Sequence, residues 1–296
     1  MTSDTSSAAS THTPAPSNYR QALRLHVVQE GSGPVVVLSH ALGCDLHMWD
    51  GVAARLKDRF TVLRYDHRGH GQSETPVGPY TMGMLADDAA QVIAQHANGR
   101  AHVVGLSMGG MMAQALAAMH PQLVSSIVVA NAACHYDDAA RAMWQARIRT
   151  VRDKGMAAIT EASMLRWFSA RFRHDLEGDG ARRVAQSQAQ LEQTDASGYA
   201  ASCEAVCHID LRHSNTTIAC PALVIAGLQD EATTLAHSQA IANAITGSQL
   251  RTLDTAHISA VEQPEAFADL LINFLDGLAQ PLGGSSRKPQ HAAPRR

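Results

Sequence analysis

The chain has 296 residues, of which 45% are hydrophobic and 17% charged, a composition typical of a folded globular protein rather than a disordered one. Its formal net charge of −3 argues against a nucleic-acid partner, because a general nucleic-acid-binding protein carries an excess of Lys and Arg. The 5 cysteines lack the even number and regular spacing of a disulfide framework. No apolar run approaches the length of a membrane helix, so we expect no membrane partner.

The two ends of the chain differ in composition from the rest. Residues 1–18 are rich in Ser, Thr, Ala and Pro and lack the basic and apolar regions of a signal peptide, so we expect a disordered tail and a cytoplasmic protein. Residues 281–296 are rich in Gly, Ser and Pro and contain Arg287, Lys288, Arg295 and Arg296. This composition is typical of a solvated basic tail, which we expect to be disordered as well.

Strand and helix patterns alternate between the two tails. Short apolar stretches predict strands at 22–30, 35–39, 60–65, 101–106, 124–130, 221–227 and 249–253. Apolar residues at helical spacing predict helices at 81–97, 108–119, 234–245 and 264–278. This alternation predicts a mostly parallel sheet with helices on both faces, which binds ligands beyond the carboxyl ends of its strands.

One long segment interrupts the strand pattern. From residue 131 to 214 no strand is predicted, and residues 139–199 have the pattern of several helices. We interpret 131–214 as a helical cap over the carboxyl edge of the sheet, inserted into an α/β core formed by 19–130 and 215–280.

The strongest local motif is Gly105-Leu106-Ser107-Met108-Gly109, which fits the pattern G-x-S-x-G. It stands between the predicted strand 101–106 and the predicted helix 108–119, where a sharp turn would expose the Ser107 hydroxyl above the sheet edge. The two glycines would let neighbouring backbone segments pass closely. We therefore predict that Ser107 is a nucleophile rather than only the N-cap of the helix.

A nucleophilic serine needs a base and a group that orients the base, and in this arrangement they follow the serine in the order acid, then histidine. His257 comes directly after the strand 249–253, at the same sheet edge as Ser107, and is the predicted base. Asp230 follows the strand 221–227 through a short turn and is the predicted acid. Glu231 is the main alternative for the acid, and Asp254 is a weaker one.

Acyl transfer also needs hydrogen-bond donors directed at the developing oxyanion. One predicted donor is the backbone N–H of Met108, and the second lies in the loop His40-Ala41-Leu42-Gly43. We predict that the second donor is Leu42, with Ala41 as the alternative one register away. The charges of the polar turn at 66–71 are expected to brace the loops of this edge.

Together these features resemble the α/β-hydrolase superfamily, from about Tyr19 to Leu278, and more narrowly the 3-oxoadipate enol-lactonases. The narrower resemblance is carried by segments of the cap and the C-terminal part of the core: Trp144 with Arg147, Arg166-Trp167-Phe168, Gly198-Tyr199-Ala200 and Ala256-His257-Ile258-Ser259. It implies an α/β-hydrolase fold, with a mostly parallel central sheet flanked by helices and an inserted helical cap. It also supports Ser107, Asp230 and His257 as the triad and implies that Trp144 lines the substrate pocket.

Enzymes of this family open a five-membered enol-lactone that carries a carboxylate on its side chain, as part of aromatic-compound breakdown. The resemblance therefore implies a serine hydrolase that acts on a small lactone or ester and needs no cofactor. The chain departs from the family at Ala205-Val206-Cys207-His208, where an Arg usually follows the apolar pair. A general carboxylesterase or metal-free perhydrolase, and a non-catalytic binding protein of the same fold, are the alternative interpretations.

A metal site is the remaining alternative, at Cys203, Cys207, His208 and His213. The two cysteines share one face of a predicted helix, but His208 points away from that face. The spacing also differs from that of zinc sites, so we expect no metal.

Overall fold

A computed structural model describes residues 23–279 of the chain. The strands are β1 (Val27–Gly31), β2 (Val35–Ser39), β3 (Thr61–Tyr65), β4 (Ala101–Leu106), β5 (Val124–Ala130), β6 (Ala222–Gly227) and β7 (Gln249–Leu253). They form one seven-stranded sheet in the order β1-β3-β2-β4-β5-β6-β7. Only β1 is antiparallel to its neighbour, so the predicted mostly parallel sheet is confirmed. The loops after β2, β4, β5, β6 and β7 therefore meet along one edge.

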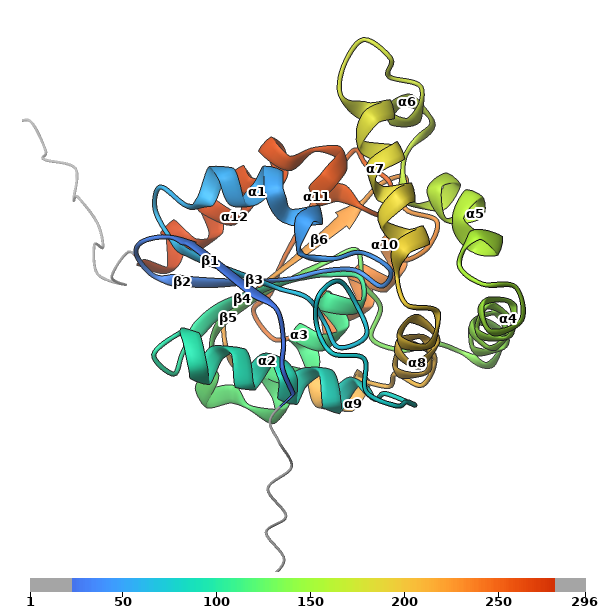
Figure 1. Cartoon of the computed structure of the whole chain (residues 1–296). Coiled ribbons are helices and arrows are strands. Elements are labelled where there is room, and N and C mark those ends of the chain that lie inside the picture. Colours follow the sequence, from blue (N-terminus) through green and yellow to red (C-terminus); the bar gives the residue numbers. More distant parts are fainter. Residues whose placement is uncertain (1–22, 280–296) are drawn as a thin grey trace, which may run out of the picture.

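Helices cover both faces of this sheet. They are α1 (Asp50–Leu56), α2 (Met82–His96), α3 (Met108–Met119), α10 (Leu235–Ala244), α11 (Ser259–Glu262) and α12 (Pro264–Ala279), with short 3-10 turns at η1 (Leu46–Trp49) and η2 (Pro121–Leu123). Figure 1 shows α1, α11 and α12 on one side of the sheet and α2 and α3 on the other.

The predicted insertion of helices lies between β5 and β6. Its helices are α4 (Asp138–Lys154), α5 (Ala157–Trp167), α6 (Ala170–Arg173), α7 (Gly180–Gln193), α8 (Ala196–Cys207) and α9 (Arg212–Asn215). In Figure 1, α4 to α8 form a group beside the sheet, whereas α9 lies under the core and contacts α3. The exact domain bounds stay a prediction, and the predicted tails at 1–18 and 281–296 lie outside the described residues.

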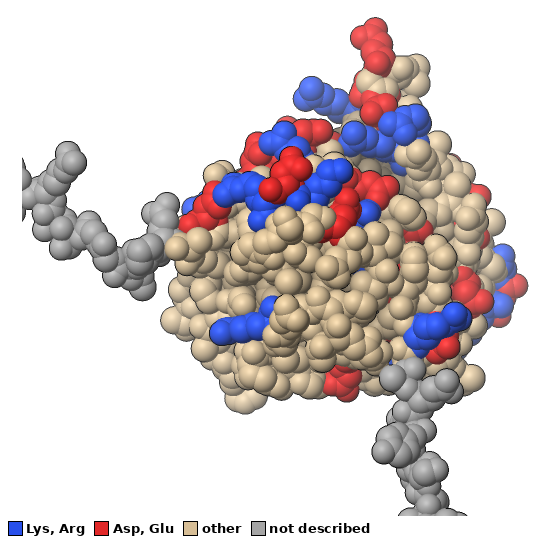
Figure 2. Space-filling model, turned by 60° about the vertical axis from the view of Figure 1, so that its left-hand side comes forward, with Lys and Arg blue, Asp and Glu red and all other residues tan. Residues whose placement is uncertain are grey.

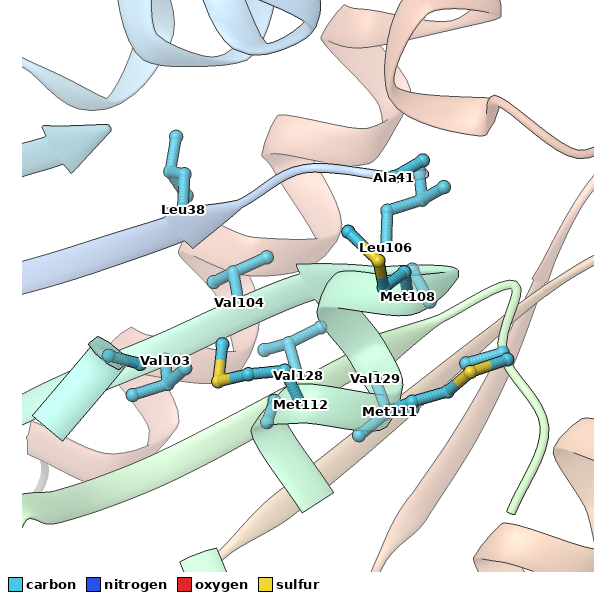
Figure 3. Close-up of a cluster of buried hydrophobic side chains, with 14 of the residues drawn as sticks. Leu38, Ala41, Val103, Val104, Leu106, Met108, Met111, Met112, Val128 and Val129 are labelled. Atoms are coloured by element: carbon cyan, nitrogen blue, oxygen red, sulfur yellow. The ribbon is translucent and has the colours of Figure 1, made fainter. Parts of the chain in front are cut away.

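Apolar side chains from the sheet and from α3 form the centre of the core. Figure 3 shows this cluster, to which Leu38, Val103, Val104, Leu106, Val128 and Val129 contribute from the strands. Met111 and Met112 of α3 have at most 1% of their surface exposed. These methionines therefore pack in the core, and their burial fixes α3 against the sheet.

Most predicted elements agree with the structure to within two residues, because clear local signals mark their ends. Thr81 caps α2 by accepting a hydrogen bond from the Met84 amide, and Asp137 caps α4 in the same way. The first strand is the exception, since it begins at Val27 rather than at residue 22. The backbone amides of Arg24 and His26 donate to the Glu74 and Ser73 side chains instead of to a neighbouring strand.

The surface carries charges of both signs. On the face in Figure 2, Lys and Arg mix with Asp and Glu over one region, and a broad stretch of other residues lies beside them. Two ion pairs join α1 and the loop after it to α12, Arg55–Asp269 at 2.8 Å and Arg59–Asp276 at 2.6 Å. Their side chains are about half exposed, so each pair contributes little to stability.

No helix between residues 23 and 279 has the length and apolar character needed to cross a membrane.

The turn from β4 into α3 allows almost no side-chain volume. A Cβ on Gly105 would lie 2.0 Å from the Gly109 carbonyl oxygen, and a Cβ on Gly109 would lie 2.2 Å from the Ser39 carbonyl oxygen. Both contacts are to backbone, which cannot rotate away as a side chain can. Strand β2, strand β4 and helix α3 therefore depend on these two glycines for their spacing.

We predict that Gly105→Ala lowers the free energy of unfolding by about 3 kcal/mol, because the new methyl group overpacks rigid backbone. The matched control is Gly277→Ala in α12, where an added Cβ meets nothing within 4 Å. That change should be neutral or raise stability by about 0.5 kcal/mol. Denaturant unfolding of both variants measures the difference, and equal stabilities would contradict the close-packing argument.

Candidate active site

A cavity of about 900 Å³ lies between the carboxyl edge of the sheet and the helices inserted after β5. The core lines it with Ser107 and His257, and the inserted helices line it with Trp144 and Trp167. This position agrees with the ligand site expected beyond the carboxyl ends of parallel strands.

Ser107 stands at the turn between β4 and α3 with φ 56° and ψ −116°. This backbone conformation is unfavourable for a residue with a side chain, and the close packing of the flanking glycines maintains it. The Ser107 amide donates to the Ala130 carbonyl at 2.9 Å, which ties the turn to the end of β5. The hydroxyl is therefore held at the cavity surface and makes no capping hydrogen bond to α3.

His257 connects Ser107 to Asp230. Its Nε2 atom lies 2.9 Å from Ser107 Oγ, and its Nδ1 atom lies 2.8 Å from Asp230 Oδ2. An ionised carboxylate can only accept hydrogen bonds, so Nδ1 carries the proton and Nε2 offers its lone pair to the serine hydroxyl. The arrangement can remove the proton of Ser107 when its oxygen attacks a carbonyl carbon.

Asp230 is held as an anion by its hydrogen bonds. Oδ2 accepts from His257 Nδ1, Thr233 Oγ1 and Asn131 Nδ2, and Oδ1 accepts from the amides of Ala232 and Thr233. Burial alone would raise the pKa of Asp230, but the charge of His257 and these hydrogen bonds outweigh burial and lower the pKa to about 2. The carboxylate is thus ionised throughout the neutral pH range.

The two alternative acids occupy other places. Glu231 lines the cavity with an exposed side chain and makes no hydrogen bond to His257. Asp254 is exposed and accepts a hydrogen bond from Gln229 Nε2 at 2.8 Å. Of the three candidates, only Asp230 contacts the histidine.

The two predicted oxyanion donors are backbone amides, and the acceptors around each amide show whether it is free to bind an oxyanion. Met108 begins α3, so its amide is one of the first-turn donors without an intrahelical acceptor. In the loop after β2, the Ala41 amide points at Met48 Sδ at 3.3 Å and the Gly43 amide donates to His70 Nε2 at 3.0 Å. The Leu42 amide between them donates to no acceptor within residues 23–279. This pattern favours Leu42 over Ala41.

Three buried imidazoles support that loop from below. His40 Nε2 accepts from the His67 amide at 2.9 Å, and His67 Nε2 lies 2.8 Å from Ser39 Oγ. As noted for the loop after β2, His70 Nε2 accepts from the Gly43 amide. Burial lowers the pKa of all three, that of His70 to about 3. Of these rings, His40 and His70 accept backbone hydrogen bonds. Charged groups of the same turn also contribute, since Asp66 Oδ1 accepts from the Leu46 amide and Arg68 pairs with Asp88.

The inserted helices place aromatic and cationic groups opposite Ser107. Trp144 is half-buried against the Tyr136 ring, with 6.1 Å between ring centroids, and lines the cavity. Arg147 and Arg166 also line it, and neither forms an ion pair in the part of the chain that the structure describes. Arg147 is fixed by two neutral oxygens, Tyr199 Oη and Ser163 Oγ, each at 2.7 Å.

The alternative metal ligands do not converge. Cys203 and Cys207 are buried in α8, and the side chain of His208 is 62% exposed. Within residues 23–279 no group of three or more His, Cys, Asp or Glu side chains has the arrangement of a metal site.

Sequence reasoning missed two residues that contact the site, Asn131 and Thr233. Asn131 directly follows a buried strand at the carboxyl edge of the sheet, and a polar residue at that position was the available signal. The hydrogen bonds of Thr233 depend on a loop conformation that the residue pattern does not specify.

We predict that Asp230→Asn lowers kcat by about 10⁴, as in the analogous protease change, because an amide at this position favours the wrong tautomer of His257. The matched control, Glu231→Gln, should leave kcat nearly unchanged, since Glu231 does not touch the histidine. Hydrolysis of a chromogenic ester measures both variants. If kcat falls strongly in Glu231→Gln and stays nearly normal in Asp230→Asn, the acid is Glu231.

Comparison with known proteins identifies the family of this chain. The model of the α/β-hydrolase fold family matches residues 34–264. The 3-oxoadipate enol-lactonase 2 of Acinetobacter baylyi is 38% identical over 246 residues, which cover 83% of this chain and 90% of that protein. The 3-oxoadipate enol-lactonase 1 of the same organism is 34% identical, over 88% of this chain and 96% of that protein. The crystal structure of the enol-lactonase from Burkholderia xenovorans is similar, with a TM-score of 0.82 and 38% identity, and the match covers 86% of this chain and 98% of that chain.

The resemblance predicted from the sequence is thereby confirmed, and the chain is a hydrolase that belongs to the α/β-hydrolase family.

Proposed function

We propose that this chain opens a small enol-lactone, of the 3-oxoadipate enol-lactone type formed during the breakdown of aromatic compounds, through an acyl-enzyme on Ser107. The observation that carries the proposal is the hydrogen-bonded chain Ser107–His257–Asp230 at the cavity surface. The enol-lactonase relatives support a hydrolase acting on ester bonds, and they support a lactone as the substrate.

The first half of the proposed reaction forms the acyl-enzyme. Ser107 Oγ attacks the ring carbonyl carbon while His257 Nε2 takes the hydroxyl proton, and the amides of Leu42 and Met108 hold the oxyanion. The bond between the carbonyl carbon and the ring oxygen then breaks. His257 returns the proton to the departing oxygen, which leaves as an enol and then becomes a ketone.

The second half releases the product. A water molecule loses a proton to His257 and attacks the acyl carbon, and the bond between that carbon and Ser107 Oγ breaks. His257 returns the proton to Ser107 Oγ, and the carboxylic acid that is released ionises to a carboxylate. Asp230 stays ionised in both halves and stabilises the imidazolium that forms each time, as its lowered pKa of about 2 supports.

The charges that line the cavity support a substrate with a carboxylate. Arg147 is oriented by neutral partners and has no acidic partner among the described residues, so its charge is available to an anionic ligand. The guanidinium is only partly buried and lines the cavity, where a bound carboxylate would form a charge-assisted hydrogen bond with it. Trp144, on the preceding turn of α4, would cover the apolar face of the ring.

The central test is turnover by wild-type protein and by Ser107→Ala. We expect the enol-lactone to be hydrolysed with a higher kcat/KM than p-nitrophenyl acetate, and Ser107→Ala to lower kcat by about 10⁶ without changing thermal unfolding. Faster turnover of simple esters would indicate a general carboxylesterase, and perhydrolysis with peroxide would indicate a perhydrolase. No turnover of any substrate would indicate a binding protein, and an active Ser107→Ala would refute the nucleophilic role.

The cap residues give a second test of substrate choice. Trp144→Ala or Arg147→Met should lower kcat/KM for the carboxylate-bearing lactone by about 10- to 100-fold. The first variant loses a ring that packs on the substrate, and the second loses a hydrogen bond to its charged group. The same variants should change kcat/KM for p-nitrophenyl acetate by less than about threefold, because acetate has no group that reaches these side chains. Equal losses for both substrates would show that these residues support the fold instead.

A further inference from the structure

Asn131 occupies the first position after β5, and its side chain is completely buried among polar groups. Its backbone has a φ of +46°, a left-handed conformation that Asn tolerates better than most residues. Its backbone N–H donates to the Ile225 carbonyl of β6 at 2.9 Å. The side chain is thus directed along the sheet edge toward the loop that carries Asp230.

The side-chain contacts of Asn131 reach two loops of the site. Nδ2 lies 3.0 Å from Asp230 Oδ2 and 3.4 Å from the carbonyl oxygen of Ala256, the residue before His257. On the other side, Ser259 Oγ lies 2.6 Å from Asn131 Oδ1. One amide therefore contacts the carboxylate of the acid loop and the backbone of the histidine loop.

Chemistry fixes the direction of this amide. Asp230 Oδ2 and the Ala256 carbonyl are both acceptors, so the NH₂ end must face them. Oδ1 must then accept the hydrogen bond that the Ser259 hydroxyl donates. The opposite orientation would place three oxygens together without a hydrogen between them.

Gly227 leaves the room that this arrangement requires. A Cβ at residue 227 would lie 2.8 Å from Asn131 Nδ2 and 2.5 Å from the Ala256 carbonyl oxygen. Any side chain there would enter the space in which the Asn131 amide joins the two loops.

We propose that Asn131 is a positioning residue for the reaction, which holds Asp230 Oδ2 against His257 Nδ1 and keeps the acid and histidine loops at a fixed separation. This inference rests on the proposed catalytic roles of Ser107, His257 and Asp230. Asn131 donates to the same carboxylate oxygen that accepts the hydrogen bond from His257 Nδ1, so it helps to determine where that oxygen lies. Apart from His257, the other donors to Asp230 are Ala232 and Thr233 of its own loop, so Asn131 is the residue that ties this carboxylate to the end of β5.

The first test is Asn131→Leu, which keeps the approximate shape and removes the donor. We expect kcat to fall by about 100-fold while KM changes by less than about threefold, as for a misplaced catalytic group. We also expect the downfield proton resonance of the His257–Asp230 hydrogen bond to shift or disappear. The matched control is Asn98→Leu: Asn98 is exposed and has a φ of +48°, so the same backbone strain arises away from the site.

The second test, Asn131→Asp, gives a signature in pH. The groups that surround residue 131 are Asp230, His257 through Asp230, the Ala256 carbonyl and the Ser259 hydroxyl. Two adjacent carboxylates retain one proton between them, and this proton can replace the amide donor. As pH rises and the proton is lost, the two carboxylates repel each other and Asp230 is displaced from His257, which lowers activity.

We therefore expect the kcat of Asn131→Asp relative to wild type to fall by tenfold or more from about pH 5 to about pH 9. A ratio that does not depend on pH, or an Asn131→Leu variant with normal kcat and an unchanged proton resonance, would overturn the positioning role. Ser107→Ala separates the two hypotheses. If Ser107→Ala is inactive and the Asn131 variants are normal, only this inference fails; if Ser107→Ala is active, the proposed function itself fails.

Discussion

The close approach of three backbone segments at the β4–α3 turn is the constraint on which the site depends. Gly105 and Gly109 let β4, α3 and the end of β2 come within a distance that no Cβ could occupy. This packing holds Ser107 in its unfavourable backbone conformation. It also brings the loop that contains Leu42 beside the first turn of α3. The nucleophile and both proposed oxyanion donors thus share one structural cause.

Strand order explains why the other groups reach Ser107. Strands β4, β5, β6 and β7 are adjacent in the sheet, and each is followed at the same edge by one polar residue of the site. Ser107 follows β4, Asn131 follows β5, Asp230 follows β6 and His257 follows β7. His257 extends back across the edge to Ser107, so Asn131 lies between the serine and the acid. A polar residue that can satisfy both neighbouring loops fits this position, whereas an apolar one would leave the carboxylate short of a donor.

The sequence could predict most of the fold, because buried parallel strands are short apolar runs with clear ends. Strand β1 was placed too early because it is an edge strand with a half-exposed pattern, and its true start depends on hydrogen bonds to residues 73 and 74. The order of elements and their shared edge were enough to select Ser107, Asp230 and His257 as candidates that the structure brings together. Their catalytic roles stay predictions.

What the sequence could not provide are contacts between residues far apart in the chain. The choice between Ala41 and Leu42 turns on Met48, whose sulfur faces the Ala41 amide. The role of Asn131 could not be predicted, because its contacts with Asp230 and Ser259 span 99 and 128 residues. The direction of Arg147 depends on Tyr199 and Ser163 in two other cap helices.

The charges on the two sides of the cavity are arranged differently, and this difference bears on the proposed reaction. On the core side, the Asp230 carboxylate is buried and accepts five hydrogen bonds, whereas the neighbouring Glu231 lines the cavity with an exposed side chain. On the cap side, Arg147 is held in place by neutral oxygens that orient its guanidinium without neutralising it. A lactone with a carboxylate would therefore enter with its charged end toward the cap, which leaves its carbonyl facing Ser107. In this arrangement the cap determines the orientation of the substrate and the sheet edge supplies the chemistry.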